Sequence, residues 1–158
     1  MSTTTLPEVG SQAPDFRLRG PGGQPIALGD YRGRRHVVLA FYPLAFSPVC
    51  SHQLPTLQRD LDRIRELGAE VLGISVDSYF ANEAFARHLG LSFPLLSDFR
   101  RQVSAQYGVL MPEAQTSTRA LFVVDKQGVI VHREVLEDPR GVPSNEDVLR
   151  ALESLRGD

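Results

Sequence analysis

The fold of this 158-residue chain follows from the stretch HVVLAFY at residues 36–42. Five apolar residues stand in a row between its ends, which is typical of a β-strand that is covered on both faces. We therefore expect a central strand here. The stretch PLAFSPVC follows at residues 43–50 and ends on Cys50, the one cysteine of the sequence. The loop after the central strand thus carries the most reactive type of side chain.

Strands and helices are expected to alternate on either side of this strand. Turn residues between short apolar pieces, up to about Gly33, predict a small N-terminal hairpin. Apolar residues at spacings of three and four predict a helix over residues 48–67, which Gly68 ends. Further strands are expected at residues 71–76, 93–97, 120–125 and 129–133, and helices at residues 81–89, 101–107 and from the cap Ser144 onward. This order predicts an α/β fold with parallel strands, helices on both faces and an antiparallel edge.

Length and composition predict one globular domain over residues 1–158, with residues 1–9 as a flexible N-terminus. A net charge of −2 gives no basic field, so nucleic acid is not an expected partner. No apolar stretch approaches the ~20 residues of a spanning helix, and residues 1–7 do not resemble a signal peptide. One cysteine allows no intrachain disulfide, which fits a reducing cytoplasm, and makes a Cys/His metal site improbable.

Cys50 is placed where a helix would favour its thiolate. Ser47 is a good N-cap and Pro48 a good first helical residue, which puts Cys50 at the third helical position. Free backbone N–H groups and the helix dipole stabilise a negative charge there, and the thiolate is the nucleophilic form of cysteine. The alternative is that Cys50 is a small buried hydrophobic residue, the usual role of a lone cysteine.

Helical spacing decides which side chains can assist Cys50. Ser47 and Gln53 lie three residues away on the same helix face, whereas His52 points elsewhere, which disfavours a Cys/His hydrolase. Arg119, in TSTRA at residues 116–120, stands at the mouth of an apolar strand and is the candidate cation. Because the chain has sixteen arginines, an ordinary surface arginine is the more common alternative for this position.

In this combination the residues resemble the peroxiredoxin family. Pro43, Ser47 and Cys50 are similar to its active-site signature, Arg119 before a strand that closes with Asp125 resembles its second signature, and GSQAPDF at residues 10–16 resembles its N-terminal opening. The stretch YPLAF at residues 42–46 is similar to the one-cysteine alkyl hydroperoxide reductase E group, and the bacterioferritin-comigratory group is also similar. The resemblance implies a thioredoxin-like fold with an N-terminal hairpin extension and a central mixed sheet flanked by helices.

It also implies a thiol-dependent peroxidase that reduces hydrogen peroxide or alkyl hydroperoxides. Cys50 would attack the peroxide and become a sulfenic acid. Ser47 would hydrogen-bond the thiolate and the peroxide, Arg119 would pair with the sulfur, and Pro43 would shield the pocket. The residues implied to contact the substrate are Tyr42, Val49 and Gln53. The resemblance implies no metal and no cofactor.

Two departures from the family pattern refine this expectation. Gln53 stands where many relatives have glutamate, and Pro55 occupies the position of a second cysteine in some relatives. The sulfenic acid would then need an external thiol: a low-molecular-weight thiol, a thioredoxin or a glutaredoxin-like protein. Pro55 should also kink its helix.

A homodimer is expected from the family, with contacts through exposed apolar residues. The candidates are Phe46, Phe80, Leu110 and Met111. The alternative function is a thioredoxin-fold peroxide sensor or holdase chaperone without significant turnover. A thiol-disulfide oxidoreductase is a weaker alternative, because the sequence has no Cys-x-x-Cys pair.

Overall fold

The computed structural model describes residues 6–47, 50–136 and 145–156, and for residues 50–52 it describes the backbone alone. Residues 1–5 of the expected flexible N-terminus and the expected helix cap Ser144 therefore lie outside the described residues. The strands are β1 (Arg17–Arg19), β2 (Pro25–Ala27), β3 (His36–Phe41), β4 (Ala69–Ser75), β5 (Leu95–Ser97), β6 (Ala120–Val124) and β7 (Ile130–Val135). The helices are α1 (Cys50–Arg59), α2 (Leu61–Glu66), α3 (Tyr79–Leu89), α4 (Gln102–Gln106) and α5 (Asn145–Ser154), with short 3₁₀ helices η1 (Pro21–Gly23) and η2 (Leu28–Tyr31).

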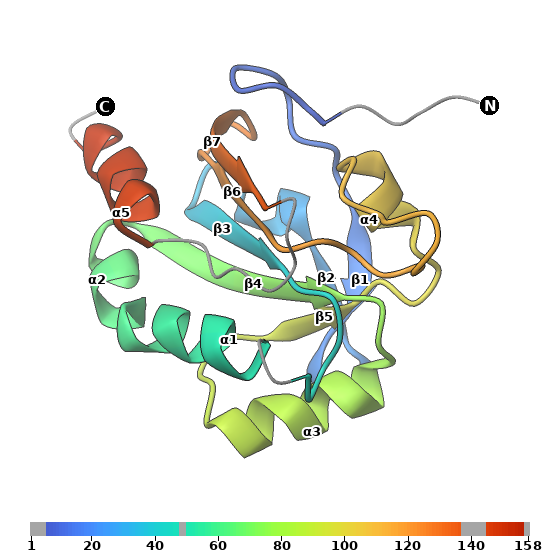
Figure 1. Ribbon diagram of the computed structural model, residues 1–158. Helices are drawn as coiled ribbons and strands as arrows, with labels where there is room; N and C mark the ends of the chain where they lie inside the picture. The colour runs from blue at the N-terminus through green and yellow to red at the C-terminus, as the bar shows by residue number, and fades with distance from the viewer. Residues whose placement is uncertain (1–5, 48–49, 137–144, 157–158) are drawn as a thin grey trace.

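Within these residues, seven strands form one mixed sheet in the order β2-β1-β5-β4-β3-β6-β7 (Figure 1). Every residue of β3 is buried, and Val38 pairs with Val71 of the parallel strand β4 and with Val123 of the antiparallel strand β6. The expected central strand is therefore confirmed. The antiparallel edge is confirmed as well, because β6 and β7 form a hairpin.

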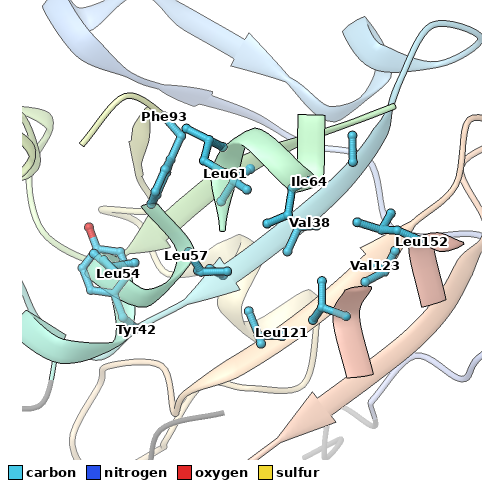
Figure 2. Close-up of a cluster of buried hydrophobic side chains, with 14 of the residues drawn as sticks. Val38, Tyr42, Leu54, Leu57, Leu61, Ile64, Phe93, Leu121, Val123 and Leu152 are labelled. Atoms are coloured by element: carbon cyan, nitrogen blue, oxygen red, sulfur yellow. The ribbon is translucent and has the colours of Figure 1, made fainter. Parts of the chain in front are cut away.

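Two apolar cores cover the two faces of the sheet, which explains the unbroken apolar run in β3. Side chains from α1, α2, α3 and α5 form the first core, and Figure 2 shows Leu57 and Ile64 of this core together with Val38. The second core includes Val103 and Tyr107, in and just after α4, and Phe16 from the N-terminal segment. Helices thus lie on both faces, as the alternating pattern predicted.

The N-terminal hairpin is confirmed and extends the main sheet. Strands β1 and β2 pair antiparallel, and Arg19 of β1 pairs with Ser97 of β5. The hydroxyl of Tyr107 donates a 2.6 Å hydrogen bond to the carbonyl of Pro14, just before β1. Burial raises the pKa of Tyr107 far above its ordinary value, so the phenol stays protonated as this bond requires.

Helix α3 begins and ends at the signals that the sequence carries. Ser78 accepts a hydrogen bond from the backbone N–H of Ala81, so the helix starts two residues before the expected position. Gly90 follows the last helical residue with a φ of 68°, a left-handed conformation that glycine adopts without a steric penalty.

The expected single helix over residues 48–67 is wrong, because α1 and α2 are separate helices. The break lies at Asp60, five residues after Pro55, and Pro55 lies inside α1. The Asp60 carboxylate accepts a 3.0 Å hydrogen bond from Asn145 at the start of α5. Burial opposes ionisation of Asp60, but the hydrogen bonds from Asn145 and Arg59 hold its pKa below the ordinary value. The break is therefore anchored to the last helix, a contact that no local pattern could reveal.

His36 is the first residue of β3, at the opposite end of the strand from the loop that leads to Cys50. Its Nδ1 atom accepts a 3.1 Å hydrogen bond from the backbone N–H of Lys126, so the ring is neutral in the folded protein. Burial lowers the pKa of His36 below its ordinary value of 6.5, and the nearby charge of Lys126 acts in the same direction.

This environment predicts a pH-dependent contribution to stability. A histidine with a lowered folded pKa binds fewer protons in the folded than in the unfolded state, so its stabilising effect is complete above pH 6.5. Below that value the free energy of unfolding should decrease as the pH falls towards the lowered pKa. Urea titrations at a series of pH values measure this slope. The variant His36→Gln, which cannot titrate, should show a shallower slope between pH 6.5 and 5, and an identical slope would contradict the assignment.

Candidate active site

Three segments of the chain meet at one end of the sheet, where the central strand β3 finishes. Strand β3 ends at Phe41, which pairs with Ala120 at the start of the antiparallel strand β6. The residue before β6, Arg119, therefore lies next to the residue after β3, Tyr42. Helix α1 begins at Cys50, after the loop that leaves β3. The topology thus brings the candidate cation and the cysteine-bearing segment to the same end of the sheet.

Arg119 is buried, with 2% of its surface exposed, so the alternative of a surface arginine is wrong. Its Nη1 atom donates a 2.8 Å hydrogen bond to Oε1 of Gln53. A buried cation is destabilising unless hydrogen bonds and charges compensate for its lost hydration. The hydrogen bond to Gln53 provides part of this compensation.

Gln53 connects Arg119 to the end of β3. It is 1% exposed, and its Nε2 atom lies 3.5 Å from the carbonyl oxygen of Phe41, at the outer limit of a hydrogen bond. Its amide thus binds Phe41 with one end and Arg119 with the other. These two contacts position the guanidinium, and the expected contact of Gln53 with substrate stays a prediction. Since the amide is neutral, Gln53 adds no negative charge beside Arg119.

Tyr42 is held at both its side chain and its backbone. The side chain is fully buried, and its hydroxyl donates a 2.5 Å hydrogen bond to Oδ1 of Asn82 in α3. Its carbonyl accepts a 3.0 Å hydrogen bond from the hydroxyl of Ser117. The side chain of Tyr42 thus lies in the core, and its expected contact with substrate stays a prediction. Ser117 was not predicted, although it stands two residues before Arg119 in the quoted TSTRA stretch.

The loop that leaves β3 forms a tight turn before Ser47. The backbone N–H of Ser47 lies 3.4 Å from the carbonyl oxygen of Leu44, and Phe46 between them has a φ of 66°. Pro43 and Ser47 are both half-buried in this loop. The remaining site predictions cannot be compared with the structure: Val49 lies outside the described residues, and of Cys50 only the backbone is described, at the start of α1. The capping role of Ser47 stays a prediction for the same reason.

The described histidines occupy three different parts of the fold. His36 begins β3, at the end of that strand opposite to Phe41, and His132 lies in the edge strand β7. His88 is exposed on α3, with its ring 5.7 Å from that of Phe46. Among the residues that the structure describes, no group of three or more His, Cys, Asp and Glu could hold a metal ion. In the same part of the chain, no helix is long and apolar enough to cross a membrane.

The sequence and the fold of the chain are both similar to those of known proteins. Residues 9–133 match the sequence model of the AhpC/TSA family. The chain belongs to this family, the peroxiredoxins. It is 40% identical over 129 residues to alkyl hydroperoxide reductase E of Mycobacterium tuberculosis, covering 80% of this chain and 84% of the relative. It is 36% identical over 161 residues to the chloroplastic 2-Cys peroxiredoxin BAS1 of Hordeum vulgare, covering 96% of this chain and 76% of the relative.

The solved structures of peroxiredoxins share the fold described above. The reduced 2-Cys peroxiredoxin of Plasmodium vivax superposes with a TM-score of 0.86 at 30% identity, covering 94% of this chain and 81% of that chain. The thioredoxin-like fold that the family resemblance implied is therefore confirmed. The protein is a thiol-dependent peroxidase of the peroxiredoxin family.

The neutral contact between Gln53 and Arg119 yields a prediction for this peroxiredoxin. In Gln53→Glu, a carboxylate of similar shape would offset the charge of Arg119 and repel a nearby thiolate. The pKa of Cys50, followed by the ultraviolet absorbance of the thiolate, should rise by about 1 unit, which corresponds to about 1.4 kcal/mol.

Gln58→Glu provides the matched control for net charge. Gln58 lies on the same helix α1, five residues farther on, where its side chain contacts Ser92. This variant should leave the pKa of Cys50 close to that of the parent. Equal shifts in the two variants would show that Gln53 has no special relation to the reactive sulfur.

Proposed function

We propose that the protein is a one-cysteine peroxiredoxin, in which Cys50 reduces hydrogen peroxide or alkyl hydroperoxides and an external thiol regenerates it. The observation that carries this proposal is the buried Arg119 guanidinium bonded to Gln53. Gln53 lies three residues after Cys50 on α1, and residues three apart share a helix face. Arg119 is therefore bonded to the face of the helix that carries Cys50.

The proposed reaction is an in-line displacement at oxygen. The Cys50 thiolate attacks one peroxide oxygen, so that a sulfur–oxygen bond forms while the oxygen–oxygen bond breaks. The leaving oxygen takes a proton and departs as water or an alcohol, and the sulfur is oxidised to a sulfenic acid. In this proposal Arg119 and backbone N–H groups of the first turn of α1 stabilise the charge on the leaving oxygen. Ser47 binds the thiolate and the peroxide, and Pro43 limits the access of water.

An external thiol completes the cycle, because the sequence contains one cysteine and the chain cannot form an internal disulfide. One thiol condenses with the sulfenic acid and releases water, and a second thiol reduces the resulting mixed disulfide. A low-molecular-weight thiol, a thioredoxin or a glutaredoxin-like protein can each supply these two equivalents. The single cysteine also supports the proposal that the protein works in a reducing compartment such as the cytoplasm.

We infer that one thioredoxin-like domain forms a homodimer through exposed aromatic residues. One continuous sheet with a core on each face supports the single domain. Phe46 and Phe80 are 52% and 69% exposed, as expected, and Phe99 is 63% exposed. Leu110 and Met111 are half-buried rather than exposed, so they contribute less apolar surface than expected. Exposed aromatic side chains are enriched at protein interfaces, which supports a second copy as the partner.

Substitution of the proposed nucleophile tests the function. Cys50→Ser should abolish peroxide consumption and leave the circular dichroism spectrum unchanged, because serine is similar in volume but is not a competent nucleophile here. In the parent, one equivalent of peroxide should produce a sulfenic acid that a dimedone-type reagent traps. Steady turnover with a supplied thiol is expected of a peroxidase. If Cys50 is oxidised once and no low-molecular-weight thiol, thioredoxin or glutaredoxin-like protein supports turnover, the sensor or chaperone alternative is favoured instead.

Arg119 should stabilise the thiolate more than the helix terminus does. A unit charge ~4 Å away contributes about 4 kcal/mol at an effective dielectric constant of ~20, whereas a helix terminus contributes about 0.3–1 kcal/mol. Arg119→Ala should therefore raise the pKa of Cys50 and slow its oxidation in stopped-flow fluorescence, with a larger pKa change than Ser47→Ala. Arg119→Lys, which keeps the charge, should recover part of the rate. An unchanged pKa of Cys50 in Arg119→Ala would show that Arg119 does not act on the reactive sulfur.

A further inference from the structure

We propose that Asp77, which follows β4, is a positioning residue for the loop that carries Pro43 and Ser47. This inference rests on the proposed peroxidase reaction at Cys50. The backbone N–H of Ala45, in the middle of the loop, donates a 2.7 Å hydrogen bond to Oδ2 of Asp77. A hydrogen bond from a backbone amide to a carboxylate is stronger than one between neutral groups.

The topology explains why Asp77 can reach this loop. Strands β3 and β4 are adjacent and parallel, so their carboxyl ends lie at the same end of the sheet. The chain after β3 turns into the loop, and the chain after β4 reaches Asp77 two residues past Ser75. The half-buried carboxylate of Asp77 therefore faces the loop from the neighbouring strand.

A buried network holds Asp77 itself in place. The hydroxyl of Ser75 lies 2.8 Å from Oδ2 of Asp77 and 3.1 Å from Oδ1 of Asn82. Asn82 is fully buried and donates a 3.2 Å hydrogen bond to the carbonyl of Leu96 in β5. The same Oδ1 atom accepts the hydroxyl of Tyr42 at 2.5 Å. One network from β4 and α3 thus contacts the loop at two places, Tyr42 at its start and Ala45 in its middle.

The conformation of the loop shows why it needs such an anchor. Phe46 has a φ of 66°, which residues other than glycine rarely adopt. The ring of Phe46 packs against the rings of Phe85 and His88, with centroids 4.9 Å and 5.7 Å apart, respectively. The Asp77 bond holds the residue before Phe46, and Ser47 comes directly after it. If the bond is lost, Phe46 can relax to a common conformation, and Ser47 is displaced.

This displacement has a specific chemical signature. In the proposed reaction Ser47 binds both the peroxide and the thiolate, but Arg119 stabilises the thiolate more than Ser47 does. Alkylation by iodoacetamide requires a reactive and accessible sulfur and no bound peroxide, so it depends on Ser47 only through this smaller contribution. Loss of the Asp77 contact should therefore lower the rate of oxidation by peroxide much more than the rate of alkylation. A general loss of structure around Cys50 would instead change both rates together.

The experiment measures both rates and the thermal midpoint of four variants of the full chain. Asp77→Ala should lower the rate constant with hydrogen peroxide by about 10- to 100-fold, the effect expected of a displacement on the order of 1 Å, and leave alkylation close to the parent rate. Asp77→Asn keeps an acceptor oxygen for Ala45 and should retain most of the peroxide rate. Ser75→Ala removes only the hydroxyl that contacts the carboxylate and should give a smaller decrease.

Asp125→Ala is the matched control for stability. Asp125 is also half-buried, and its carboxylate also accepts backbone hydrogen bonds, from Gln127 and Val129. It lies in the turn after β6, at the end of the sheet opposite to the proposed site. This variant should lose thermal stability and keep the parent peroxide rate.

Four results would overturn the inference. They are a parent-like peroxide rate in Asp77→Ala, equal losses of oxidation and alkylation in that variant, an equal loss of peroxide rate in Asp125→Ala, and no rescue by Asp77→Asn. If Asp77→Ala does not fold, Ser75→Ala carries the test, and an unchanged peroxide rate in it would reject the network. A parent protein that does not consume peroxide would instead reject the proposed function itself, so the two failures are distinguishable.

Discussion

The hydrogen bond between the guanidinium of Arg119 and the amide of Gln53 is the contact on which the site depends. A buried arginine cannot be hydrated, so its surroundings must supply acceptors at fixed positions. Gln53 does this only if α1 starts at the correct height above the sheet, and its second contact, to the carbonyl of Phe41, ties that height to the end of β3. The positions of helix α1, strand β3 and the Arg119 guanidinium therefore depend on one another.

The sheet order makes this arrangement possible. Strand β3 has β4 on one side and β6 on the other, the first parallel and the second antiparallel. The end of β3 consequently lies beside the end of β4 and the start of β6. Asp77, Tyr42 and Arg119, which are far apart in the sequence, become neighbours of one loop because of this order alone.

The sequence predicted the elements well where one local signal decides them. The apolar run of β3 and the left-handed Gly90 each act within a few residues, and the structure follows them closely, whereas the cap Ser78 was not predicted and α3 begins two residues earlier than expected. The burial of Arg119 could not be derived in this way, because it depends on a contact with Gln53, 66 residues earlier in the sequence. Asp60 is a similar case, since its partner Asn145 belongs to the last helix. Asp77 and Ser117 carried no signal at all, because their function is to bind backbone groups of a loop that the sheet places beside them.

The proline in the second turn of α1 gives the helix an uneven distribution of hydrogen bonds. Pro55 has no N–H group, so the helix lacks the bond that this residue would make to the carbonyl four positions earlier. The turn that begins at Cys50 is therefore joined to the rest of the helix more weakly than an ordinary first turn, by about 1 kcal/mol. Helix α1 therefore holds its first turn with fewer backbone hydrogen bonds than a helix without proline, while Leu54 and Leu57 fix its later turns in the first core.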